Sequence, residues 1–231
     1  MRVKEINIDK EINLLQEIRL IHSLYDSGYS LWVSDINYQK MKPIFDNFPG
    51  VVNVGKTTNG ISFRESTTIT HKTPETKFNG HVKPLFFPKS LIEFCEKEWV
   101  DDRMDKVLFT GLLTKKRENI INRFNNLKLK ELIYKNKNNG RVFPVKSFDK
   151  DYFTEMSTYN FVFCPDGDFI WTYRFFESIM CGSIPIVENE CDIFKGFKYY
   201  KVDDDLTKIT YNMNWVLDNL EYLKTNFTIL I

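Results

Sequence analysis

The second half of the chain alternates short apolar runs with amphipathic stretches, which is the pattern of a parallel α/β sheet. The apolar runs predict strands at 107–110, 129–134, 161–164, 183–187 and 198–202. Between and after them, apolar residues at helical spacing predict helices at 115–124, 149–156, 172–182 and 206–224. The segment 160–188 has the clearest pattern, because a strand, a turn, a helix and a second strand form one βαβ unit.

The first hundred residues have a less regular pattern. We expect helices at 10–27, 38–48 and 88–98 and a strand at 30–34. The apolar runs 51–54 and 61–63 flank an Asn59-Gly60 pair, which predicts a hairpin. The polar segment 65–83 predicts a loop. A polar break at Asp101 and Asp102 suggests two domains, at 1–100 and 101–231.

Composition narrows the class of protein. The 231 residues carry a net charge of +1, which is not the electrostatic footprint of a nucleic-acid-binding protein. No apolar run approaches the ~20 residues that a membrane span needs, so we expect no transmembrane segment and a cytoplasmic protein. Cys95, Cys164, Cys181 and Cys191 form no Cys-x-x-Cys pair, so no metal site is expected. The aromatic content of 15% is typical of a Phe-rich core, although a few rings could also stack on sugars.

Polar residues follow the strand at 161–164, where the carboxyl edge of a parallel sheet binds ligands. This edge carries Pro165, Asp166, Gly167, Thr172, Tyr173, Arg174 and, one helical turn further, Glu177. Arg174 can clamp a phosphate and Glu177 can accept hydrogen bonds from the hydroxyls of a ribose. The alternative is an intrahelical ion pair between Arg174 and Glu177, worth only ~0.3 kcal/mol.

A second candidate phosphate site follows the strand at 107–110. Gly111 opens a short loop, Thr114 can cap the next helix, and Lys115, Lys116 and Arg117 add positive charge. A strand that enters a helix through a glycine-containing turn presents free backbone N–H groups to an anion. The alternative is an ordinary capped helix with basic residues on its surface.

Together these motifs resemble the nucleotide-sugar half of GT-B glycosyltransferases, and among them the exostosin-like family. The matching residues are Cys164-Pro165-Asp166-Gly167, Trp171, Arg174-Phe175-Phe176-Glu177, Gly182-Ser183-Ile184-Pro185 and the segment from Phe109 to Arg117. The resemblance implies a GT-B-like α/β fold with a Rossmann-type parallel sheet in the C-terminal half. It implies that Arg174 and Glu177 hold a nucleotide-sugar. The N-terminal half is short for a second Rossmann-like domain, so it is either a reduced acceptor-side domain or a smaller accessory layer.

The resemblance also bears on mechanism. Many retaining GT-B enzymes carry two glutamates separated by seven residues, and Phe169 stands at the first of these positions here. An inverting reaction is therefore expected, with a general base supplied by the N-terminal half. Asp35 is the first candidate because it closes a predicted strand, and Glu65 and His71 are alternatives. For each of them, a turn aspartate or a solvated loop residue is the simpler interpretation.

A metal-dependent GT-A enzyme would carry an Asp-x-Asp motif. Asp203-Asp204-Asp205 contains this pattern, but we interpret it as the cap of the last helix. The expected function is transfer of a sugar from a nucleotide-sugar, with UDP-sugar as the expected donor, to a glycan or glycoconjugate hydroxyl without an obligatory cofactor. The alternatives are a fucosyltransferase-like enzyme that uses a GDP-sugar and a non-catalytic domain that binds sugar nucleotides or glycans.

Overall fold

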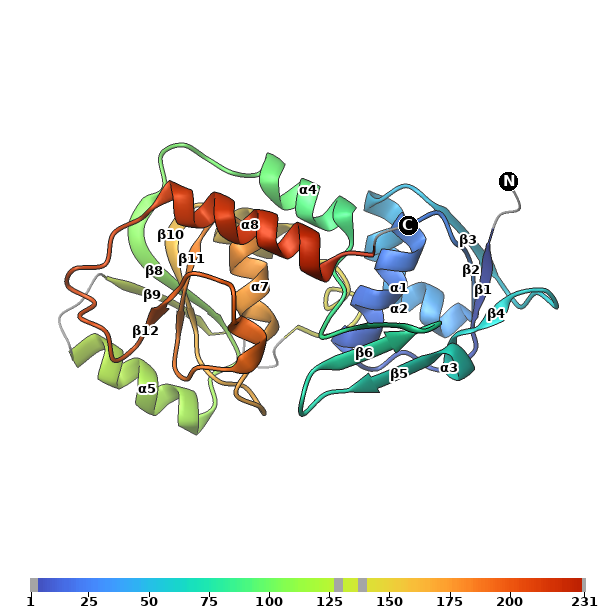
Figure 1. Ribbon diagram of the computed structural model, residues 1–231, viewed down its shortest axis with the longest axis horizontal. Coiled ribbons are helices and arrows are strands. Elements are labelled where there is room, and N and C mark those ends of the chain that lie inside the picture. The colour runs from blue at the N-terminus through green and yellow to red at the C-terminus, as the bar shows by residue number, and fades with distance from the viewer. Residues whose placement is uncertain (1–3, 127–130, 137–140, 230–231) are drawn as a thin grey trace. The chain divides into compact units, whose positions relative to one another are not determined.

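The computed structural model describes residues 4–126, 131–136 and 141–229 of the chain (Figure 1). It shows a mixed α/β structure with parallel sheets and a Rossmann-like fold, as the alternating pattern predicts. The chain divides into two compact units. Unit 1 takes in the described residues of Met1–Ile92, Val142–Asp149 and Lys224–Ile231, and unit 2 those of Glu93–Arg141 and Lys150–Leu223. The predicted domains, 1–100 and 101–231, differ from these units, because unit 1 also takes in two segments from the second half of the chain.

Unit 1 is built on a four-stranded parallel sheet in the order β3-β2-β1-β4. Its elements are β1 (Glu5–Ile8), α1 (Leu15–Asp26), β2 (Ser30–Val33), α2 (Asp35–Asn47), β3 (Val51–Val54) and β4 (Ile61–Ser62). Ile6 and Ile8 of β1 and Leu31 and Val33 of β2 are buried, because successive side chains of a strand point to opposite faces. Figure 1 shows α1 and α2 together beside one face of this sheet.

Two predictions for this sheet are wrong. The runs 51–54 and 61–63 do not form a hairpin, because β3 pairs with β2 and β4 pairs with β1, both in parallel. Strand β1 was not predicted at all, and α1 begins at Leu15 rather than at residue 10. This strand has only four residues, Glu-Ile-Asn-Ile. Two apolar residues in alternation are too few to show that a strand rather than a loop precedes the helix.

The segment 65–83 is also not a loop. It contains α3 (Phe63–Ser66) and an antiparallel sheet of β5 (Thr67–Thr70), β6 (Glu75–Phe78) and β7 (His81–Lys83). Asn79 and Gly80 have φ values of 44° and 84° and join β6 to β7, with Phe78 opposite His81. These values suit a two-residue primed hairpin turn. The hairpin therefore forms at the second Asn-Gly pair of the chain rather than at Asn59-Gly60.

Unit 2 is built on a five-stranded parallel sheet in the order β12-β11-β10-β8-β9. Its strands are β8 (Met104–Gly111), β9 (Leu132–Asn136), β10 (Tyr159–Cys164), β11 (Ile184–Val187) and β12 (Tyr200–Lys201). Its other elements are α4 (Lys89–Lys97), α5 (Lys115–Asn126), α6 (Lys150–Met156), α7 (Tyr173–Met180), the 3-10 helix η1 (Asp192–Phe194) and α8 (Met213–Phe227). The first residues of α4 and the last residues of α8 are counted in unit 1. Strand β9 is added on one side of β8, and β10, β11 and β12 follow on its other side, so the order of the strands reverses between β8 and β10. Ligands of open parallel sheets bind at the carboxyl ends of the strands beside such a reversal.

Most element predictions for unit 2 are confirmed. In the segment 160–188, Thr172 caps α7 and Gly182 follows its end with a φ of 72°. The first residues of the predicted strand 129–134 lie outside the described residues. The last helix begins at Met213 rather than at 206, and the oxygen of Asn212 accepts from the amides of residues 214 and 215. The acidic run 203–205 is therefore not its cap, and Asp205 instead closes a local turn with Thr207 and Lys208.

Candidate functional site

The predicted binding residues of unit 2 gather where β8 and β10 end. Gly111 to Thr114 connect β8 to α5, and Pro165 to Thr172 connect β10 to α7. Because β8 and β10 are parallel neighbours, both connections leave the same edge of the sheet. The two motifs lie about 50 residues apart in the sequence, yet hydrogen bonds join them directly, from Lys116 to Asp166 and from Arg174 to Thr110.

Arg174 is the most unusual side chain at this edge. Only 9% of it is exposed, and its Nη2 donates to the carbonyl of Thr110 at 2.8 Å. Its guanidinium lies 4.7 Å from the centroid of the Phe109 ring. Among the described residues, its Nε and Nη1 have no hydrogen-bond partner. A buried donor without an acceptor costs about 1–3 kcal/mol. An anion that accepts from Nε and Nη1 of Arg174 would remove this cost for both donors.

Gly111 makes room for this arginine. A Cβ atom built on Gly111 would run into the guanidinium of Arg174. Any larger residue would push Arg174 from its place over Phe109. The glycine is therefore required here by a close approach of a side chain.

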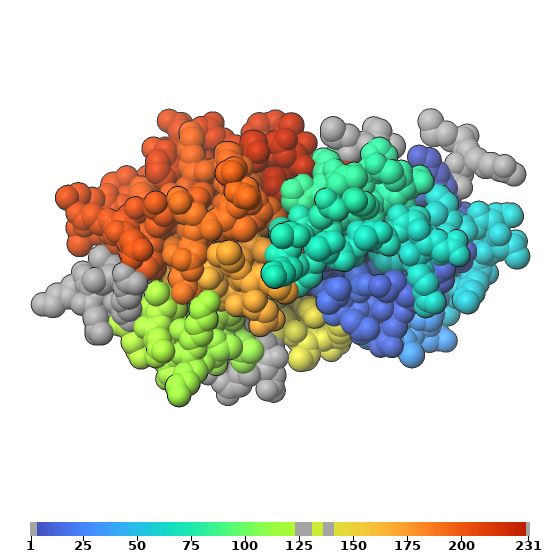
Figure 2. All heavy atoms as spheres, turned by 60° about the horizontal axis from the view of Figure 1, so that its bottom comes forward, coloured from blue at the N-terminus to red at the C-terminus, as the bar shows by residue number. Residues whose placement is uncertain are grey.

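Arg117 lies beside Arg174 and closes the other side of the site. Its Nε donates to the carbonyl of Asp166 at 3.1 Å and its Nη1 to the carbonyl of Leu112 at 3.0 Å. Burial lowers the pKa of Arg117, and the positive charge of Arg174 lowers it further. Thr114 caps α5 as predicted, because its hydroxyl accepts from the amide of Arg117. The lysines of the same turn stay exposed at the surface of α5, which Figure 2 shows in yellow-green.

Asp166 is buried in the middle of the site, with 6% of it exposed. Its Oδ2 accepts from Asn189 at 2.8 Å and from Lys116 at 3.4 Å, while its Oδ1 has no partner within the described part of the chain. Its own amide donates to Glu188 at 3.1 Å. The site thus contains acids as well as arginines, and its distinguishing feature is the unpaired donors of Arg174 rather than an excess of charge.

The turn residues around Asp166 shape the same edge. Pro165 is buried where β10 ends, and the amide of Gly167 donates to the carbonyl of Phe169 at 3.0 Å. Thr172 accepts from the amide of Arg174 at 3.4 Å, which orients the first turn of α7. The ring of Tyr173 is half-buried and lies 5.2 Å from that of Trp171.

Glu177 is fully buried and engaged by partners that the sequence did not predict. Its carboxylate accepts from Arg141 at 3.0 and 3.2 Å and from the hydroxyl of Tyr152 at 2.8 Å. Burial and the charge of Glu177 raise the pKa of Tyr152. The side chain of Arg141 is only 15% exposed. The ribose-binding role of Glu177 stays a prediction.

The three candidate bases lie in unit 1 and do not form a cluster in the structure. Asp35 is the exposed first residue of α2, and Ser34 is the residue that caps this helix. Glu65 is exposed in α3, and the Nδ1 of the half-buried His71 lies 3.0 Å from the Oε1 of Gln16. Asp35 also lines an open pocket of about 440 Å³, together with Ile36, Gln39, Lys40, Phe143 and Pro144.

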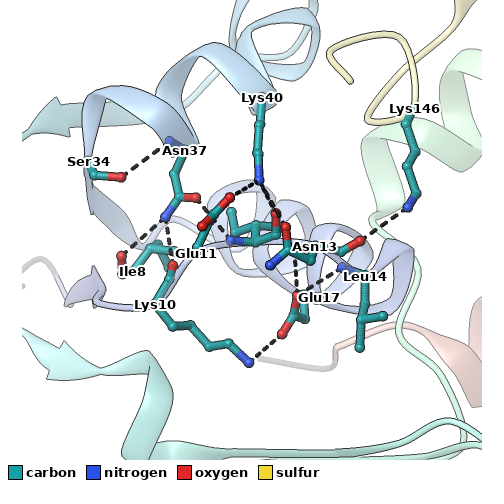
Figure 3. A network of polar contacts seen from close by, with 11 residues as sticks. Ile8, Lys10, Glu11, Asn13, Leu14, Glu17, Ser34, Asn37, Lys40 and Lys146 are labelled. Atoms are coloured by element: carbon teal, nitrogen blue, oxygen red, sulfur yellow. Dashed lines mark hydrogen bonds and ion pairs between the residues drawn. The ribbon is translucent and has the colours of Figure 1, made fainter. Parts of the chain in front are cut away.

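The equivalent edge of unit 1 is filled by its own side chains (Figure 3). In the turn between β1 and α1, Glu17 accepts from the amides of Asn13 and Leu14 at 3.0 Å and pairs with Lys10. Burial raises the pKa of Glu17, but these hydrogen bonds outweigh burial and lower it overall. The side-chain amide of Asn37 donates to the carbonyl of Lys10, and the Nζ of Lys40 donates to the carboxylate of Glu11. A carboxylate of the chain therefore already occupies two amides of the turn that an external phosphate would approach.

In comparisons with known proteins, neither a family model nor a curated protein matches this chain. Within the described ranges, no helix is both long and apolar enough to cross a membrane.

Proposed function

We propose that this protein is a glycosyltransferase that binds the diphosphate of a nucleotide-sugar at the carboxyl edge of the unit 2 sheet. The observation that carries the proposal is the buried guanidinium of Arg174, which has two donors without partners beside a second arginine. Arginine presents a planar fork of donors that matches the oxygens of a phosphate. The reversal of strand order between β8 and β10 is also where such folds bind nucleotides.

The chemistry follows from this placement of charge. The acceptor hydroxyl oxygen forms a bond to the anomeric carbon of the donor, and the bond from that carbon to the diphosphate oxygen breaks. The proton of the hydroxyl passes to a general base, for which Asp35 remains the first candidate. Arg174 and Arg117 stabilise the negative charge that develops on the leaving diphosphate, which is the largest electrostatic demand of the reaction. The motif resemblance to exostosin-like enzymes supports a sugar as the transferred group.

Nucleotide binding tests the proposal directly. Calorimetric titrations of the full chain with UDP, GDP, dTDP and CMP should show binding of at least one nucleoside diphosphate. We expect Arg174→Ala to weaken that binding by about 100-fold, because a charge-assisted, two-donor contact contributes roughly 2–3 kcal/mol. Hydrolysis of the matching nucleotide-sugar by the wild-type protein would then distinguish an enzyme from a binding domain.

A matched control removes a positive charge from β8, the strand that leads into the site, near its opposite end. Lys106 lies near the start of β8 and pairs with Glu131 at 2.8 Å, so Lys106→Ala should leave nucleotide affinity unchanged. Equal affinities in wild-type and Arg174→Ala protein would refute the site. A drop that Lys106→Ala shares would show a general effect of charge rather than a specific contact.

A further inference from the structure

Unit 1 contains a separate pocket at the carboxyl edge of its own parallel sheet. The pocket has a volume of about 360 Å³. Its lining comes from the ends of β1 and β2, the loop after β3 and helix α3, and includes Asp9, Lys10, Glu11, Trp32, Lys56 and Arg64. Concave sites with a few convergent polar groups at such edges are the usual places for small ligands.

The charged side chains of the pocket are unequally engaged. Lys10 pairs with Glu17, and Glu11 pairs with Lys40. Asp9 accepts from the hydroxyl of Ser62 at 2.5 Å and from the backbone amide of Arg64 at 2.9 Å. Within the described residues, the side chains of Lys56 and Arg64 form no ion pair, and both are exposed. The lining holds three basic and two acidic residues, a net charge of +1. Burial raises the pKa of Asp9, but the hydrogen bonds from Ser62 and the backbone amide of Arg64, together with the charge of Arg64, lower it overall.

Trp32 supplies an aromatic surface to the same pocket. It is half-buried, and its indole Nε1 donates to Glu5 at 3.2 Å, which fixes the orientation of the ring. Trp32 belongs to the face of the sheet opposite to the buried Leu31 and Val33. On the same face, Asn7 and Asn53 flank Trp32 in the sheet register, and Asn53 donates to Ser30 at 3.1 Å. An aromatic ring beside amide and carboxylate groups suits a saccharide, whose rings have an apolar face and a hydroxylated rim.

A nucleotide fits this pocket less well. The turn between β1 and α1 would have to receive its phosphates, but the Glu17 carboxylate already accepts from the amides of Asn13 and Leu14 in that turn (Figure 3). Among the lining side chains, Lys56 and Arg64 remain for an anion. They can neutralise one negative group attached to a sugar ring, but they cannot replace a helix N-terminus for a diphosphate.

We propose that this pocket is a second ligand site, for a saccharide that carries one negative group, either a carboxylate or a phosphate monoester. Trp32 stacks on the sugar ring, and Lys56 and Arg64 contact the anion. The site does not depend on the nucleotide site of unit 2, since all of its residues belong to unit 1.

Ligand-observed NMR on the full chain tests the site with three probes: methyl glucoside, methyl glucuronide and glucose 6-phosphate. We expect at least one of the charged sugars to bind roughly tenfold tighter than the neutral one, and the charged pair to reveal which anion is preferred. The double variant Lys56→Ala/Arg64→Ala should remove this preference. The control Lys77→Ala, which removes an exposed lysine paired with Glu75 on β6, should keep it.

Two further variants separate the site from its alternatives. Trp32→Phe keeps an aromatic ring and should bind the charged sugar several-fold more weakly than wild type, whereas Trp32→Ala should abolish binding. Arg174→Ala should bind the charged sugar normally, so loss of nucleotide binding and loss of saccharide binding are distinguishable. The proposal is overturned if neutral and charged sugars bind equally, if none of them binds, or if the double variant keeps the preference of wild type.

Discussion

Arg174 and Arg103 lie in the same unit but should respond to the same substitution in opposite ways. Replacing Arg174 with Met keeps the length of the side chain and removes the guanidinium. The protein loses one charged hydrogen bond to Thr110, worth about 1.5–3 kcal/mol, and a contact with the Phe109 ring worth about 0.5–2 kcal/mol. It gains relief from two buried donors without acceptors, worth about 2–6 kcal/mol. These contributions nearly cancel, so the free energy of unfolding should change by less than about 1 kcal/mol.

Arg103 is the matched comparison because both terminal nitrogens of its guanidinium have acceptors. It donates to the carbonyl of Tyr159 at 3.0 Å and to that of Cys181 at 2.7 Å, and it lies 5.7 Å from the ring of Trp99. Arg103→Met leaves both carbonyls without this donor and should cost about 3 kcal/mol. For a chain of this length, that corresponds to a fall in Tm of about 6–12 °C, against less than about 4 °C for Arg174→Met.

Thermal unfolding with and without a bound nucleotide measures both effects. A ligand that binds only the folded protein raises its Tm, so the nucleotide should stabilise wild type and Arg103→Met but not Arg174→Met. If Arg174→Met lost as much stability as Arg103→Met, Arg174 would be a structural residue. The interpretation of its unpaired donors as a waiting anion site would then be refuted.

Two further outcomes follow from single residues. Burial, and then the charge of Arg19, hold the pKa of His22 well below 6.5, so the unfolded chain takes up a proton that the folded chain refuses. The free energy of unfolding should therefore keep the full contribution of His22 above pH 6.5 and fall by up to ~1.4 kcal/mol per pH unit below it. Urea titrations at several pH values should show this slope in wild type and not in His22→Gln. The same slope in both proteins would contradict the role given to His22. Gly111→Ala should displace Arg174 and weaken nucleotide binding by tenfold or more in calorimetry, because the added Cβ meets the guanidinium. Gly28→Ala strains the backbone, because Gly28 has a φ of 83°, but nothing in unit 1 lies within 4 Å of the added atom and affinity should stay unchanged; equal affinities in all three proteins would count against the role of Gly111.

Much of unit 2 could be predicted from local pattern. Its strands are short apolar runs that Pro165, Gly167 and Gly182 interrupt, and these residues end elements for reasons that act within a few positions. The same turn residues placed Gly111, Arg117 and Arg174 at or shortly after the ends of strands. Parallel pairing then brings these ends together, so the residues of the candidate site were predictable once the fold class was known.

Unit 1 was harder because its strands carry little apolar signal. In β6, only Thr76 and Phe78 are buried, and one of these two residues is polar. Asn59-Gly60 and Asn79-Gly80 are identical as dipeptides, yet of these two pairs Asn79-Gly80 alone makes a hairpin turn. A hairpin needs strands on both sides that pair with each other, and β3 and β4 find other partners.

The partners of Glu177 show what lies beyond local pattern altogether. Arg141 and Tyr152 are 36 and 25 residues away from it, and neither carries a spacing that points to Glu177. Residue types and their order along the chain determine helices, strands and caps, because these depend on backbone geometry within a few residues. Which charge is buried against which partner, and which donors of Arg174 stay without one, depends on packing between distant segments, and only the folded chain brings those segments into contact.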